Sequence, residues 1–120
     1  MMQDFRDLKV WQRAHAVTLA VYRVTASFPA EERYGLTAQL RRSAGSVAAN
    51  IAEGRCRGTD ADFGRFLQIA LGSAAETEYH LILTRDLELI AQEDSDRLLA
   101  EVAEVKKMLT ALLLKLKAEG

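Results

Sequence analysis

Polar side chains repeat at intervals of three and four along residues 36–53, and they are the first candidates for chemistry. They are Gln39, Arg42, Ser46, Asn50 and Glu53. A helix turns about 100° per residue, so this spacing places all five on one stripe. Such a stripe either lines a substrate cleft or fixes the register of two packed helices through mutual hydrogen bonds. We expect the second role, opposite a later polar series formed by Ser73, Thr77, His80 and Thr84.

Metal-binding and nucleophilic chemistry find little support in the residue pattern. The two histidines, His15 and His80, fall on different predicted helices, and the single cysteine, Cys56, falls at a helix end. A metal site needs clustered His, Cys or carboxylate ligands. The Glu-x-x-His pattern of di-iron bundles is not met, because Glu76 and His80 are four positions apart rather than three. We therefore expect no catalytic residue, no metal and no cofactor.

Arginines are concentrated in the second quarter of the chain. Residues 33–65 carry six arginines against three acids, whereas residues 76–104 carry nine acids against two arginines. Arginine pairs with phosphates through a planar fork and stacks on bases, which makes a cluster of arginines a candidate nucleic-acid surface. The candidates are Arg41, Arg42, Arg55, Arg57 and Arg65. Alternatively, the first two pair with Glu53 or Glu76 between packed helices, and those near the turn are solvated.

Four helical segments would position these residues. The first covers residues 10–28, with apolar residues at three-and-four spacing. Pro29 ends it, because the residue before a proline is disfavoured in helical geometry. The second segment covers residues 36–53 and is expected to end at Gly54, since glycine is common just after a helix.

The third and fourth segments complete the set. Thr59 is expected to cap the third, with Asp62 three residues on as in a capping box, and this helix is expected to extend to Ala91. The fourth, rich in leucine, follows Ser95. Short links between long amphipathic helices make neighbours antiparallel. The sequence therefore predicts an all-α, antiparallel up-down-up-down four-helix bundle, with residues 1–120 forming a single domain.

Bulk properties agree with one small helical protein. The chain has 120 residues, is 49% hydrophobic and 28% charged, and contains one proline. No apolar run approaches the roughly 20 residues that span a bilayer, and the first residues lack the pattern of a secretion signal. Because a single cysteine forms no internal disulfide, we expect a cytoplasmic location.

Small residues separate the apolar and polar stripes of the second segment. They are Gly45, Ala48, Ala49 and Ala52, and a similar patch, Gly72 to Ala75, lies in the third segment. Such faces allow close helix contact on several sides. We therefore expect the chain to bury more surface than a lone subunit hides, and to function as a homo-oligomer.

Three blocks of sequence and the leucine-rich last segment resemble the 23S ribosomal RNA intervening-sequence proteins. The blocks are FRDLKVWQRAH at residues 5–15, YGLTAQLRRSAGSVAANIAEG at 34–54 and DFGRFLQIALGSAAETE at 62–78. They occur in the family's order and cover nearly the whole chain. One departure is Ala48, where such proteins commonly have proline, so we expect a straighter second helix here.

The resemblance implies an antiparallel bundle that assembles into a cyclic homopentamer, with no established catalytic activity or cofactor. Family genes occur in insertions in bacterial ribosomal RNA genes and elsewhere in genomes. A related group serves diversity-generating retroelements, in which a basic pentameric barrel binds nucleic acid and a reverse transcriptase. The family positions that match, Arg41, Arg42, Asn50 and Glu53, are carried over as assembly or interaction residues.

Three functional hypotheses follow from the sequence. The first is a non-enzymatic, oligomeric scaffold that binds RNA or a nucleic-acid-processing partner through its arginine-rich surface. The second is a purely structural or protein-partner module with no nucleic-acid role. The third is an enzyme with a polar cleft between helices, which would require a pocket joining Asn50, Glu53 and Glu76.

Overall fold

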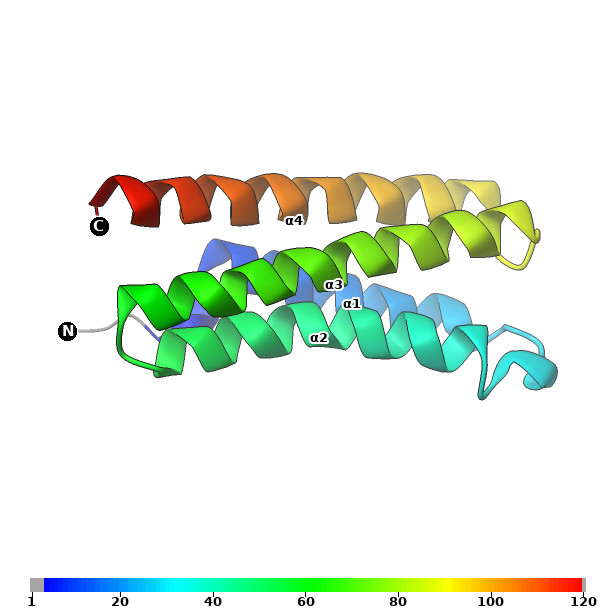
Figure 1. Ribbon diagram of the computed structural model, residues 1–120. Coiled ribbons are helices and arrows are strands. Elements are labelled where there is room, and N and C mark those ends of the chain that lie inside the picture. The colour runs from blue at the N-terminus through cyan, green and yellow to red at the C-terminus, as the bar shows by residue number, and fades with distance from the viewer. Residues whose placement is uncertain (1–3, 120) are drawn as a thin grey trace.

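The computed structural model describes residues 4–119 and shows a bundle of four long helices (Figure 1). These helices are α1 (Lys9–Thr25), α2 (Leu36–Cys56), α3 (Asp60–Asp86) and α4 (Gln92–Glu119). Two short 3-10 helices, η1 (Phe5–Asp7) and η2 (Ala30–Glu32), precede α1 and α2, and the described residues contain no strand. Successive helices run in opposite directions, and α4 also packs against α1, which closes the bundle. The all-α prediction is confirmed.

The core consists of the apolar stripes that the spacing predicts. Their central side chains are completely buried, among them Val21, Leu40, Leu67, Leu98 and Leu109. Burying one such side chain stabilises a fold by about 1.5–3 kcal/mol. The result is an elongated body of 46 × 21 × 20 Å, in which the helices lie along the long axis (Figure 1).

Gly54 does not end α2, so that expectation is wrong. The helix continues to Cys56, and Gly54 is buried inside it. A Cβ atom at Gly54 would lie 2.6 Å from the Cβ of Phe66 and 3.2 Å from Cδ1 of Phe63, both on α3. Glycine is therefore needed for close contact between α2 and α3. Gly58, with φ of +91°, lies in the turn that follows.

Two other helix ends differ from the prediction. α1 ends at Thr25 rather than at Phe28, although Phe28 is still buried. α3 ends at Asp86, not at Ala91, because Glu88 adopts φ of +60° and the N–H of Leu89 donates to the Thr84 carbonyl oxygen at 3.0 Å. These are the features of a Schellman motif, in which glycine is usual.

The beginnings of the helices follow local side-chain chemistry. Thr59 caps α3 as predicted, since its hydroxyl accepts a hydrogen bond from the Asp62 N–H at 3.1 Å. Asp4 caps η1, and the hydrogen bonds it accepts from the side chain and backbone of Arg6 lower its pKa to about 2. No described helix has the length and apolar character needed to cross a membrane.

Candidate functional site

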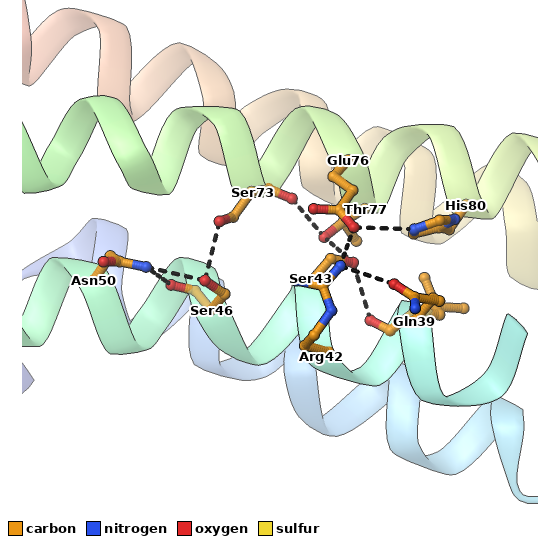
Figure 2. Close-up of polar contacts among 10 residues, drawn as sticks. Gln39, Arg42, Ser43, Ser46, Asn50, Ser73, Glu76, Thr77 and His80 are labelled. Atoms are coloured by element: carbon orange, nitrogen blue, oxygen red, sulfur yellow. Dashed lines mark hydrogen bonds and ion pairs between the residues drawn. The ribbon is translucent and has the colours of Figure 1, made fainter. Parts of the chain in front are cut away.

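A row of polar contacts joins α2 to α3, and Figure 2 shows its members facing one another across the gap between the two helices. At one end, the Ser73 hydroxyl donates to the Ser46 hydroxyl at 3.0 Å. Asn50 Nδ2 donates to the carbonyl oxygen of Ser46 at 2.8 Å and lies 3.0 Å from its hydroxyl. Among the described residues, Ser46 is thus the one member of the polar stripe that bonds to the facing series, while Asn50 bonds along its own helix.

The centre of the row is a buried pair of hydroxyl groups, of Ser43 and Thr77. The sequence predicted Thr77 at this contact but not Ser43. Their oxygens are 3.0 Å apart, and both residues are fully buried. Each also bonds its own helix, Ser43 to the Leu40 carbonyl oxygen and Thr77 to that of Ser73. The available signal was a serine directly before Ala44 in the apolar stripe.

The third part of the row is charged and lies nearer to solvent. Arg42 donates to Gln39 Oε1 at 2.9 Å and forms an ion pair with Glu76. Nε2 of His80 lies 3.2 Å from the same carboxylate, and the His80 side chain is only 13% exposed. Its Nδ1 atom is buried without a hydrogen-bond partner in the described part of the chain. Arg42 and Glu76 therefore pair between helices, as the structural alternative expected, whereas its expectation that Arg41 pairs with Glu53 or Glu76 is wrong.

Two expected members lie outside this row. Glu53 forms an ion pair at 2.9 Å with Arg57, one turn further along α2. Thr84 is buried and donates to the Leu81 carbonyl oxygen of its own helix. Because Glu53 pairs along α2 while Glu76 pairs with Arg42, the two carboxylates that an enzymatic cleft required are engaged at different places.

The chemistry of this row is that of a helix contact. The hydroxyls of Ser43 and Thr77 bond to helix carbonyl oxygens, and no hydroxyl group of residues 4–119 forms a hydrogen bond with His80. No group of three or more His, Cys, Asp or Glu residues in that range is placed to hold a metal ion. Paired buried hydroxyls favour one register of α2 against α3, because a shift would break the hydrogen bond between Ser43 and Thr77 and leave each with only its own helix as partner.

The arginines do not form one surface. Arg41 is in the second turn of α2 and faces α1, where its Nε donates to the Thr25 hydroxyl at 2.8 Å and its guanidinium lies 4.5 Å from the ring centroid of Tyr22. Arg42 faces α3 instead. Arg55 lies fourteen positions beyond Arg41, about 21 Å at the rise of an α-helix.

The other three arginines surround the turn between α2 and α3. Arg57 and Arg65 both lie over the ring of Phe66, at 4.9 and 4.6 Å from its centroid, and Arg55 lies 5.4 Å from that of Phe63. Arg57 pairs with Glu53, and Arg65 pairs with Asp62. The positive charge at this turn is therefore largely offset by neighbouring acids.

The fold and its contacts define a four-helix protein in which the polar residues between α2 and α3 serve helix packing. Comparison with known proteins identifies the family. The profile described as 23S rRNA-intervening sequence protein matches residues 6–111. The chain belongs to this family.

A solved structure supports the assignment. It is a protein of unknown function from the S23 ribosomal protein family of Bacteroides thetaiotaomicron, 28% identical to this chain. The match covers 87% of this chain and 97% of that one, with a TM-score of 0.78. Neither the family description nor the description of this structure names a reaction. The comparison with curated proteins gave no match.

Proposed function

We propose that the protein is a non-catalytic scaffold that works as an assembly of identical copies, five if it follows the ring size that the family resemblance implies. The observation that carries this is a pair of uncharged helix segments that expose large apolar side chains. Residues 66–75 of α3 and 108–114 of α4 contain no charged side chain, although Ile69 is 45% exposed and Leu114 is 63% exposed. The solvent side of a surface helix normally carries charged and polar residues.

A groove adjoins these two segments. A groove of about 460 Å³ runs between the start of α3 and the end of α4. Its apolar walls are formed by Leu71, Leu113, Leu114 and Leu116, and the charged side chains of Asp60, Arg65 and Lys117 also line it. Contiguous exposed apolar surface of this kind is typical of contacts with another protein.

Glycines on α3 support the same proposal. Gly64 lines the groove and Gly72 is exposed, and a Cβ atom on either would meet nothing within 4 Å in the subunit. Glycine inside a helix costs about 1 kcal/mol relative to alanine. Nothing within the subunit offsets that cost, whereas close approach of a second copy would. Gly45, by contrast, faces Thr18 of α1 within the subunit.

Light scattering combined with size exclusion tests the proposal. The wild-type protein should have a mass at least twice the 13.3 kDa of one chain. Leu114→Glu places a charge in the groove wall and should lower that mass while leaving the helix content unchanged. Leu87→Glu, at an exposed position beside the turn between α3 and α4, is the matched control and should assemble normally. A Leu114→Glu variant of unchanged mass would contradict the proposed surface.

Nucleic-acid binding is a second candidate, at the end of the bundle where the turn between α2 and α3 lies beside the end of α4 (Figure 1). Arg65 and Lys117 line the same groove there, and Arg55, Arg57 and Lys115 lie on the same two segments. In a ring these groups would repeat, so that weak contacts would add through multivalency.

Mobility assays with single-stranded and structured RNA at low salt test this candidate. Binding through phosphates should weaken steeply as salt rises, because counterions are released on binding. Replacing Arg55 and Arg57 together by glutamate should abolish binding and leave the assembly mass unchanged. Absence of any retarded band for the wild-type assembly would exclude the candidate and leave the scaffold proposal standing.

A further inference from the structure

A polar cleft of about 280 Å³ lies at the opposite end of the bundle, between the end of α1, η2 and the start of α2. Arg33, Thr37 and Arg41 line it together with Thr25 and Phe28. The cleft is separate from the groove between α3 and α4 and from the arginines around the turn after α2. Its lining combines two cations with a hydroxyl group at the beginning of a long helix.

Arg41 is held in place but is not neutralised. Its Nε donates to Thr25 Oγ1 at 2.8 Å, its Nη2 donates to the Tyr22 carbonyl oxygen at 3.4 Å, and its guanidinium stacks on the Tyr22 ring. These partners carry no charge, and no carboxylate of residues 4–119 forms an ion pair with Arg41 or Arg33. Arg33 lies 5.9 Å from the ring centroid of Tyr34, which is 87% exposed.

Thr37 adds donors between the two arginines. It is the second residue of α2, and the cap residue Gly35 offers no side chain to the first turn. Glu32 accepts from the Leu36 N–H at 3.3 Å. The Thr37 N–H and hydroxyl have no partner within the described residues. The first turn of a helix favours anions through its free N–H groups and its dipole.

We infer that this cleft binds the phosphate group of a nucleotide-like phosphate monoester, with the Tyr34 ring as a stacking surface for the base. Two guanidinium groups, together with the hydroxyl and the N–H of Thr37, match a phosphate with three acceptor oxygens and close to two negative charges. A carboxylate has one charge and two oxygens, and would leave one arginine unmatched. The inference does not depend on the assembly, because every group comes from one subunit.

Calorimetric titration of the intact protein with adenosine monophosphate and with orthophosphate tests the inference. Both should bind at a single type of site per chain, with the nucleotide several-fold tighter and in a range of about 1 mM or below. Tyr34→Ala should remove the advantage of the nucleotide and leave orthophosphate binding unchanged.

Arginine variants locate the site. Arg33→Gln and Arg41→Gln should each weaken binding of both ligands by about tenfold, since each removes a charge-assisted contact. Arg13→Gln is the matched control and should bind like the wild type, because Arg13 is exposed on α1 and forms no ion pair within residues 4–119. Arg33 makes no hydrogen bond through its side chain within the described chain, so its replacement should preserve the fold.

Two results would overturn the inference. One is the absence of binding heat with either ligand in a protein whose helix content and assembly mass are normal. The other is undiminished binding in both arginine variants. Neither result would bear on the scaffold proposal, which is tested by mass.

Discussion

The two faces of α3 show opposite ways of meeting a neighbouring helix. Towards α2, α3 fits closely around Gly54 and is registered by paired hydroxyls such as those of Ser43 and Thr77. Towards the end of α4, α3 leaves an open, mainly apolar groove lined by Gly64, and Gly72 is exposed with nothing within 4 Å of its Cβ position. The first contact is complete within one subunit. The second is incomplete, which is the physical reason to expect another copy there.

Among the substitutions considered, glycine to alanine should show the largest difference in stability between the two faces of α3. Gly54→Ala would place a Cβ atom 2.6 Å from the Cβ atom of Phe66. A Cβ atom is bonded directly to the backbone, so it has little freedom to move away. We expect a loss of about 2–3 kcal/mol in the free energy of unfolding, measured by urea denaturation.

Gly72→Ala is the matched control, because the added methyl group meets nothing in the subunit. In a Leu114→Glu background, where the copies should be apart, it should stabilise the chain by about 0.5–1 kcal/mol through helix propensity. Equal effects of the two alanine substitutions would remove the distinction between the faces.

The buried hydroxyl pair should give the next largest effect. Thr77→Val keeps the shape of the side chain but leaves Ser43 without its partner across the helices, and should cost about 1–2 kcal/mol. The double variant Thr77→Val/Ser43→Ala should lose less free energy of unfolding than the sum of the two single variants. A double-mutant cycle should give a coupling of about 0.5 kcal/mol or more. Strict additivity would show that the pair does not register α2 against α3.

The ion pair of Arg42 with Glu76 should matter least. Both side chains are more than one-third exposed, so solvent screens their attraction. Arg42→Gln should lower the free energy of unfolding by about 0.5 kcal/mol, and added salt should shrink the difference. A loss as large as that of Thr77→Val would mean that the charged end of the row, rather than its buried centre, sets the register.

The helices could be predicted from sequence because apolar spacing is a local signal. An apolar stripe such as the one containing Leu40 and Ile51 faces a core in any tertiary arrangement of the helices. Thr59 and Asp62 likewise indicated the start of a helix. The helix ends were less predictable. Gly54 resembles a terminator until Phe66 is placed against it, and Glu88 ends α3 in a conformation for which glycine is the usual signal.

The site residues show the same limit. The spacing of Ser46 and Asn50 indicated which face of α2 they occupy, and the structure places that face against α3. Spacing did not show that Arg41 and Arg42, adjacent in sequence, face different helices. It also did not predict that Arg33 and Arg41 line one cleft, because the loop between α1 and α2 determines where Arg33 lies.

The mass of the protein in solution tests the central claim most directly. If the groove between α3 and α4 is a contact between copies, light scattering at micromolar concentration should report a multiple of 13.3 kDa for the wild type and a smaller mass for Leu114→Glu. A folded, monodisperse wild-type particle of 13.3 kDa would contradict the claim.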